Sequence, residues 1–230
     1  MEIIIQNFVV NFAHKILSMK KILFALSVTG SALCFAQKEF QPAGSTIIET
    51  VEGDLDGDQI PEKVIIYNTK DESEDESGNI REIQILKKVK GKWTVLEKSR
   101  HAILESNAGG MMGDPYQNTT IEKGILMITQ AGGSTWRWGH TDKYRFQNGQ
   151  FELIGYFSEY GKPEEYSTEV DFNLSTGQLN FKKKVENTEE YGKSTQETYI
   201  KKGIKLNLQN RRQKEHIEFT LPKTKEKVYL

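Results

Sequence analysis

The sequence predicts an all-β fold, an antiparallel and hairpin-rich meander, from three observations. Apolar and polar residues alternate along most of the chain, which is the pattern of half-buried strands. Glycine-containing pairs separate successive strand-like runs, and glycine supplies the positive φ that tight hairpins need. No window carries the apolar stripe of an amphipathic helix. A sandwich, an open barrel and a partial propeller all fit this pattern.

The first 36 residues have the layout of a secretory signal peptide. The basic run Met19-Lys20-Lys21 precedes an apolar stretch at 22–35, and the small residue Ala36 stands before an expected cut ahead of Gln37. The apolar stretch is shorter than the roughly 20 residues that a membrane-spanning helix needs. We therefore expect an exported protein, periplasmic or secreted, whose working start is Met19.

What remains after the cut, residues 37–230, is expected to form a single β-domain. The only cysteine, Cys34, is removed with the leader, so neither disulfides nor thiol chemistry are expected. Three lysines and one glutamate are removed too, which moves the net charge from −1 to −3. This near balance predicts no nucleic-acid partner, and the mature form has no stretch that predicts a transmembrane segment.

Alternating acids near the start of this domain predict a metal site. Asp54, Asp56, Asp58 and Glu62 recur within nine residues, directly before a strand-like run. Calcium takes six to eight oxygen ligands, and carboxylates at alternate positions of a tight loop converge on one point. The backbone carbonyl of Ile60 would add another oxygen. The sequence therefore predicts a structural calcium ion held by these five residues; the alternative is an acidic turn that binds nothing.

The same run resembles the calcium loop of FG-GAP repeats, the β-propeller units of integrin α-chains and many bacterial exported proteins. Their loops read Asp-x-Asp/Asn-Gly-Asp-Gly-x-x-Asp, often with a proline before the last acid, as Pro61 is here. Gln59 stands where glycine is usual, and Glu62 replaces the closing aspartate. The resemblance covers this single loop and implies calcium binding but no activity. The whole chain also looks like small exported bacterial proteins that carry one such loop ahead of a β-meander.

Strand-like runs and turns follow in order. Val64–Tyr67 and Ile125–Ile128 are apolar on both faces and predict central strands covered on both sides. Other runs alternate and predict strands with one buried face: 82–85, 170–174, 204–208 and 217–221. The turns expected between strands are Lys90-Gly91, Lys123-Gly124, Asn148-Gly149, Thr176-Gly177 and Lys202-Gly203.

The remaining segments have less regular patterns. Asp71–Asn79 and Glu186–Thr198 are polar and predict solvated loops. Ala102–Ser106 favours a short helix. We expect a C-terminal hairpin within Tyr199–Leu221, and we expect the basic tail Lys223–Leu230 to be frayed.

A glycine-flanked aromatic segment is the second candidate site. Trp136 and Trp138 are two residues apart, which places them on one face of a strand, with Arg137 on the other. Exposed indoles stack well on flat rings and sugar faces, so an envelope or extracellular ligand, carbohydrate in particular, is the expected partner. The alternative is a core aromatic cluster with Tyr144 and Phe146.

Catalysis has weaker support in the sequence. The histidines after residue 36 are His101, His140 and His216, and no two have the spacing of zinc ligands. Ser134, His140 and Asp142 suggest a hydrolase triad, but no nucleophile elbow surrounds the serine. The sequence predicts a non-catalytic binding or envelope-associated module stabilised by calcium. The alternative is a hydrolase that acts on a periplasmic or extracellular polymer.

Overall fold

The fold is that of a computed structural model, which describes residues 39–212 and 217–230. The expected signal segment, residues 1–36, lies outside the described residues. The strands lie within one compact unit, Pro42–Leu230. Its three sheets are antiparallel and none closes into a barrel, so the predicted all-β meander is confirmed.

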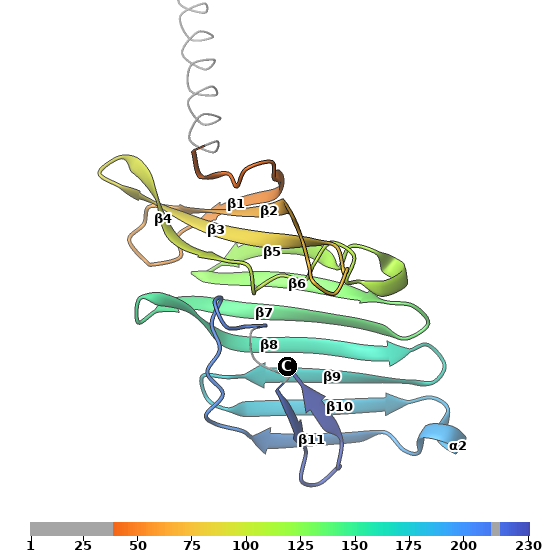
Figure 1. The fold of residues 1–230 in the computed structure, drawn as a ribbon. Coiled ribbons are helices and arrows are strands. Elements are labelled where there is room, and N and C mark those ends of the chain that lie inside the picture. The colour runs from red at the N-terminus through yellow and green to blue at the C-terminus, as the bar shows by residue number, and fades with distance from the viewer. Residues whose placement is uncertain (1–38, 213–216) are drawn as a thin grey trace, which may run out of the picture. The chain divides into compact units, whose positions relative to one another are not determined.

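The first sheet has four strands in chain order, drawn in orange to yellow in Figure 1. Each strand pairs with the next along the chain, so the sheet is built entirely of hairpin connections. Its strands are β1 (Thr46–Gly53), β2 (Glu62–Glu72), β3 (Asn79–Val89) and β4 (Lys92–Ser99).

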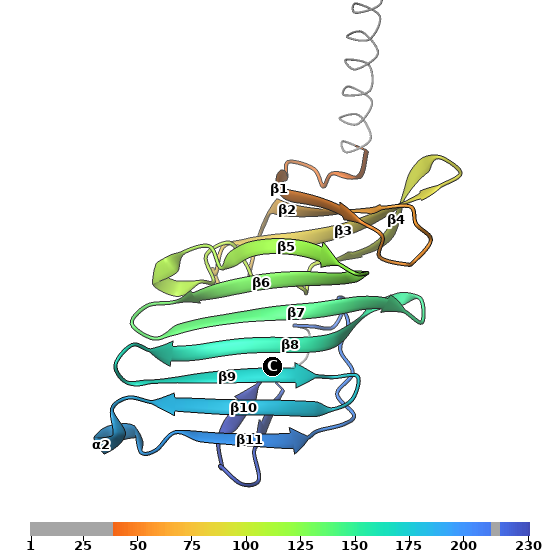
Figure 2. The ribbon, with the colours of Figure 1, turned by 180° about the vertical axis from the view of Figure 1, so that it is seen from behind.

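The second sheet has seven strands, again in chain order, and Figure 2 shows them side by side from behind. They are β5 (Tyr116–Glu122), β6 (Ile125–Gly133), β7 (Arg137–Gln147), β8 (Gln150–Lys162), β9 (Tyr166–Asn173), β10 (Gln178–Val185) and β11 (Thr195–Ile200). A 3₁₀ turn, η1 (Gly110–Met112), precedes β5, and a one-turn helix, α2 (Thr188–Tyr191), precedes β11. A final hairpin consists of β12 (Glu218–Thr220) and β13 (Lys227–Tyr229).

Four of the five predicted glycine turns join consecutive strands. In the Asn148-Gly149 turn both residues have positive φ, 54° and 78°, as a two-residue type I′ hairpin requires. Lys90-Gly91 and Lys123-Gly124 have the same geometry, and Gly177 has a φ of 81° between β9 and β10. The hairpin predicted at Lys202-Gly203 is wrong, because no strand follows it directly.

One of the two runs predicted as doubly covered strands is confirmed. All four residues of Val64–Tyr67, in β2, are buried. Along Ile125–Ile128, in β6, only Leu126 and Ile128 are buried, and the alternate residues are half-exposed. The second prediction is therefore wrong: this strand lies inside its sheet but has one covered face only.

The largest core cluster joins the two main sheets. It brings Val64 and Ile85 of the four-stranded sheet together with Leu126 and Tyr144 of the seven-stranded sheet. Since all four are buried, removal of apolar surface from water holds the sheets together. By the register of β6 to β8, the residues that enter this cluster lie on one face of the seven-stranded sheet, here called the inner face.

The predicted strand at 204–208 is instead a strap across β8. Its apolar alternation is correct, since Leu206 and Leu208 are buried in the main core. Its pairing is limited to one isolated bridge, Glu152 to Asn207, flanked by two backbone hydrogen bonds. The pairing of β8 with β9 starts only at Gly155, so the edge of β8 before it is free to receive this segment.

The C-terminal hairpin lies later in the chain than predicted. Residues 199–200 belong to β11, and the hairpin is formed by 218–220 with 227–229. The tail predicted to fray is strand β13, whose Val228 is buried against Phe172 and Phe181 in the second core cluster. The carboxylate of Glu197 also fixes this hairpin, because it accepts hydrogen bonds from the amides of residues 223 and 224.

The predictions for the short helix and for the two polar loops have different outcomes. The helix predicted at Ala102–Ser106 is wrong: the segment is irregular, and the amide of Leu104 donates to the Gln130 side chain. The loop predicted within Asp71–Asn79 is confirmed between β2 and β3, while Glu186–Thr198 contains α2 and the start of β11. Across the part of the chain that the structure describes, no helix has the length and apolarity of a membrane span.

Truncation of Leu221 tests whether the C-terminal hairpin is packed against the core or frayed. Leu221 is fully buried in the second core cluster, so Leu221→Ala should lower the free energy of unfolding by about 2–5 kcal/mol. The matched control is Ile200→Ala at the end of β11, where the side chain is 53% exposed and the cost should stay within about 0.5 kcal/mol. Urea unfolding of both variants provides the measurement, and equal costs would contradict the packing described here.

Candidate functional site

The three aspartates of the acidic loop converge, as the sequence predicts. One carboxylate oxygen from each of Asp54, Asp56 and Asp58 lies within 4.8 Å of the others. Backbone amides hold them in place: the Asp54 oxygens accept from Gly57 and Gln59 at 2.7 and 3.0 Å. The loop therefore gathers three negative charges at the end of β1 before β2 begins.

A lysine from a neighbouring strand supplies a positive charge to this cluster. Lys87 of β3 donates from Nζ to Asp56 Oδ2 and, at 2.7 Å, to Asp58 Oδ2. This hydrogen bond lowers the pKa of Asp58, with help from the amide of Ile60, and the two carboxylates raise the pKa of Lys87. Lys87 thus neutralises in part the charges that a bound cation would neutralise.

The remaining predicted ligands lie outside the three-carboxylate cluster. Glu62 is fully buried and accepts a hydrogen bond from the amide of Leu55 at 2.8 Å, which closes the loop. Its Oε1 is buried and has no hydrogen-bond partner among the residues that the structure describes, and burial raises the pKa of its carboxyl group. Ile60 is 44% exposed at the loop surface. Gln59 has a φ of 67°, the left-handed conformation that glycine usually provides at this point.

The donor set suits a hard cation such as calcium. Three carboxylates in a loop anchored between strands provide the oxygen ligands that calcium prefers. Lys87 has to leave its two aspartates for such an ion to enter. The residues therefore fit a calcium ion that competes with an internal ammonium group.

The two predicted ligand-binding tryptophans lie in different surroundings. Trp136 stands in the turn before β7, where its ring stacks on Tyr160 at 5.5 Å between centroids and also contacts Tyr166 and Tyr191. Trp138 lies within β7, and its ring stacks on His140 at 5.8 Å. Arg137, between them, is exposed on the opposite face of the strand.

The core aromatic cluster with Tyr144 and Phe146, which was the alternative for the two tryptophans, does not form. Among the described residues, neither indole makes a ring contact with Tyr144 or Phe146, whose positions are set by the main core instead. Both indoles are half-buried. Trp136 thus belongs to a rim cluster of four rings at the ends of β8, β9 and α2, and Trp138 belongs to a pocket.

This pocket has a volume of about 850 Å³. Its floor is the inner face of the seven-stranded sheet, and its walls are the loop between β2 and β3, the connection that follows β4 and the C-terminal segment. The floor residues are Gln130, Trp138, His140, Asp142 and Tyr156; the walls include Asp75, Ser77, Leu104, Glu105, Ala108, Arg211, Arg212, Ile217, Tyr229 and Leu230.

A buried ion pair fixes the floor to one wall. Arg211 Nε donates to Asp142 Oδ2 at 2.7 Å, and both side chains are at least nine-tenths buried. The Tyr144 hydroxyl donates to the same oxygen, and the guanidinium of Arg211 lies over the ring of Tyr156. The other carboxylate oxygen, Asp142 Oδ1, is buried and has no hydrogen-bond partner among residues 39–212 and 217–230.

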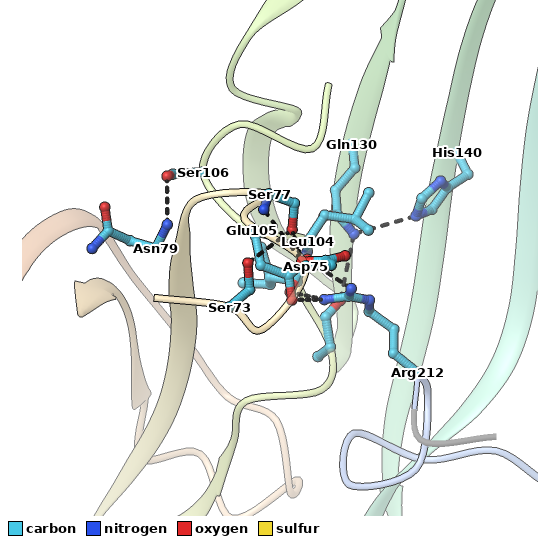
Figure 3. Close-up of polar contacts among 12 residues, drawn as sticks. Ser73, Asp75, Ser77, Asn79, Leu104, Glu105, Ser106, Gln130, His140 and Arg212 are labelled. Atoms are coloured by element: carbon cyan, nitrogen blue, oxygen red, sulfur yellow. Dashed lines mark hydrogen bonds and ion pairs between the residues drawn. The ribbon is translucent and has the colours of Figure 1, made fainter. Parts of the chain in front are cut away.

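Gln130 determines which nitrogen of His140 carries the proton (Figure 3). Gln130 Oε1 accepts from the amide of Leu104 at 2.7 Å, so its Nε2 is the donor group. That Nε2 lies 3.2 Å from His140 Nε2, which must accept and is therefore unprotonated. A neutral His140 thus carries its proton on Nδ1.

Burial keeps His140 neutral. Burial lowers the pKa of the imidazole, and the charges of Arg211 and Arg212 lower it further, whereas Asp142 acts in the opposite direction. Protonation of Nε2 would also place two donors against each other, His140 and the Gln130 amide. The sequence-predicted triad receives no support from this arrangement, because Ser134 lies exposed in the turn before β7.

The second wall is held by another arginine, also visible in Figure 3. Arg212 forms a two-pronged pair with Glu105, at 2.8 and 2.7 Å, and donates to the carbonyl of Ile103. Asp75, near it, accepts from the amide and hydroxyl of Ser77; such hydrogen bonds, with one from Ser73, lower the pKa of Asp75 to about 2.

Sequence reasoning missed most of this pocket. Its residues come from segments more than a hundred positions apart, as the pair of Glu105 and Arg212 shows. One signal was present: Trp138, His140 and Asp142 alternate along one strand, which places an indole, an imidazole and a carboxylate on one face.

Comparisons with other proteins add no assignment: no protein family, curated protein or solved structure matches this chain. The pocket and the acidic loop are therefore the features of the molecule that point to a function.

Because His140 is neutral in the folded protein, the free energy of unfolding should fall in mildly acidic solution. Its pKa in the folded protein is lowered, so below the unfolded value of about 6.5 the unfolded chain binds more protons, and the free energy of unfolding falls as pH falls. His140→Gln keeps an acceptor toward Gln130 without a titrating group, so it should reduce the stability lost between about pH 7.5 and about pH 5.5.

Urea unfolding at the two pH values measures this difference. Thr141→Ser, the neighbouring position on the opposite face of β7, is the control and should keep the wild-type pH dependence. An unchanged pH dependence in His140→Gln would show that this imidazole titrates alike in the folded and unfolded chains.

Proposed function

We propose that the protein is an exported, non-catalytic module that binds a small ligand in the pocket and is stabilised by calcium at residues 54–62. The observation that carries the proposal is the pocket itself. Its volume of about 850 Å³ lies in the range of small-molecule sites, and its lining combines aromatic rings with a few fixed polar groups.

The electrostatics of the pocket favour binding over catalysis. Both arginines are already paired, Arg211 with Asp142 and Arg212 with Glu105. General acid–base catalysis needs a group that exchanges a proton near the working pH, whereas these pairs hold their charges in fixed positions. Side chains that ion pairs already hold in place lose less conformational entropy when a ligand binds, which suits a recognition site.

Export is supported by the sequence alone. The basic run at residues 19–21, the apolar stretch at 22–35 and the small residue Ala36 have the order of a secretory leader. A chain without cysteine after that point is compatible with an oxidising compartment, because it has no thiol to protect.

Calcium at the acidic loop is the structural part of the proposal. The convergent carboxylates of Asp54, Asp56 and Asp58 support it, as does the resemblance of the loop to those of FG-GAP repeats. The loop lies outside the pocket lining, so the ion would stabilise the entry into β2 rather than contact the ligand.

Filling the pocket should abolish ligand binding. Ala108 is a half-buried wall residue that belongs to neither ion pair, so Ala108→Trp would place a large side chain in the pocket and leave the paired residues themselves unchanged. Four probes cover the main chemistries: methyl β-glucoside, choline, benzoate and inorganic phosphate. Calorimetric titration of the purified protein should show binding of at least one probe, and Ala108→Trp should remove it.

The matched control is Arg137→Ala, which changes an exposed side chain on the opposite face of β7 and should leave binding unchanged. Failure of all four probes to bind would refute the proposed function. Equal binding by wild type and Ala108→Trp would refute the pocket as its site.

Calcium should raise the melting temperature of the protein relative to chelator. Extracellular calcium modules have Kd values of about 10⁻⁴–10⁻³ M, and free calcium at about 100 times Kd adds about 2.7 kcal/mol to the free energy of unfolding. Asp56→Ala removes one of the three convergent carboxylates and should abolish this gain. Lys87→Gln removes the competing ammonium group and should tighten calcium binding.

Thermal unfolding with calcium and with chelator measures both effects. Asp71→Ala is the matched control, because Asp71 is an exposed aspartate outside the loop that pairs with Arg100, and calcium should still stabilise this variant. If calcium leaves the melting temperature of the wild type unchanged, the loop is an acidic turn that Lys87 holds and that binds no calcium.

A further inference from the structure

We infer that the pocket recognises a neutral, hydroxylated ring, that is, a sugar unit of an envelope or extracellular carbohydrate. The inference rests on the proposed function and specifies its ligand class. Four features of the lining carry it: a free donor, a free acceptor, charges that are mostly paired and an aromatic floor.

The free donor is His140. Its Nε2 accepts from Gln130, so the proton of the neutral imidazole is on Nδ1. Within the described residues, Nδ1 makes no hydrogen bond, and the side chain is partly exposed along the pocket floor. A ligand oxygen is the partner that this N–H lacks.

The free acceptor is Asp142, two residues further along the same face of β7. Arg211 and Tyr144 both donate to Oδ2, whereas Oδ1 is buried and has no partner in the described part of the chain. An unpaired buried carboxylate oxygen is costly, so a ligand donor that reaches it gains the strength of a charge-assisted hydrogen bond. A hydroxyl group both donates and accepts, and therefore matches a site that offers one group of each kind.

The charges of the lining disfavour an anionic ligand most, and they place guanidinium groups beside a cationic one. Arg211 is balanced by Asp142, and Arg212 by Glu105, while Asp75 adds one further negative charge at the wall. A ligand anion would meet three carboxylates, and a ligand cation would lie beside two guanidinium groups. Neutral hydroxyls avoid both repulsions and still hydrogen-bond to either kind of group.

The aromatic floor provides flat apolar surface for the ring. Trp138 and His140 are nearly parallel, with 16° between their planes, and Tyr156 lies beside His140. The indole is held over Gly132, where any Cβ would come within 2.5 Å of it, so its position depends on that glycine. Aromatic rings of this kind stack against the C–H face of a sugar with little loss of side-chain entropy.

The test compares ligands first, because they can be changed without disturbing the fold. Methyl glycosides of glucose, galactose, mannose and N-acetylglucosamine are titrated into the purified protein, with choline and benzoate as charged probes. At least one glycoside should bind more tightly than either charged probe. 2-Methoxytetrahydropyran keeps the ring but lacks the hydroxyls, and should bind about ten-fold or more weakly than that glycoside.

Indole N–H signals in NMR spectra locate the site. Trp138 lines the pocket, whereas Trp136 and Trp93 lie outside its lining, so the glycoside should shift the Trp138 signal alone. Trp→Phe variants assign the three signals. Asp142→Asn should also weaken glycoside binding about ten-fold or more if it folds, because the acceptor loses its charge; the ligand comparison decides the question if it does not.

The outcomes separate this inference from the proposed function. Binding of choline or benzoate in the pocket without binding of any glycoside would overturn the inference and leave the proposed function standing. Equal binding of the glycoside and 2-methoxytetrahydropyran would overturn it too, since the hydroxyls would then contribute nothing. No binding by any probe would refute the proposed function, and this inference with it.

Discussion

The structure depends on covering one face of a seven-stranded meander. Successive hairpins build this sheet, but they provide nothing to pack on its inner face, where side chains such as Tyr144, Phe151 and Phe172 would otherwise contact water. Large aromatic side chains gain much free energy from burial. The elements outside the sheet are therefore organised by this face: the four-stranded sheet and the strap at 204–208 cover β6 to β8, and the C-terminal hairpin covers β9 and β10.

The pocket lies on the part of the inner face that neither core cluster fills. Its floor residues Trp138 and His140 belong to neither cluster, and its walls come from the loop between β2 and β3, the connection after β4 and the C-terminal segment. Two ion pairs hold these walls: a buried one joins Arg211 to Asp142 on the sheet, and a partly exposed one joins Arg212 to Glu105 on the connection. Such pairs contribute less to stability than to specificity of position, because desolvation offsets much of their attraction. Here the ion pairs fix the positions of the pocket walls.

The acidic loop follows a different, local logic. Its three aspartates lie within five residues and are arranged by backbone amides of the same loop, so little of the fold is needed to bring them together. Lys87 is the exception, because it comes from β3 and reaches the loop only when the first sheet has formed. The charge of the loop is therefore coupled to the sheet, and any cation that binds there has to replace a contact that the fold already makes.

The sequence by itself determined the features that depend on near neighbours. Alternation and glycine pairs were enough to predict the all-β meander, four hairpin turns and the convergence of Asp54, Asp56 and Asp58, because strand periodicity, turn geometry and loop curvature are local. Tertiary structure alone decided where Leu206 and Leu208 pack, which residues form the C-terminal hairpin and where the two indoles separate. The pocket also depends on it, since Glu105 meets Arg212, and Asp142 meets Arg211, only after distant segments have docked on the inner face. Pairing between such segments depends on which apolar surface each can cover, and no local pattern encodes that choice.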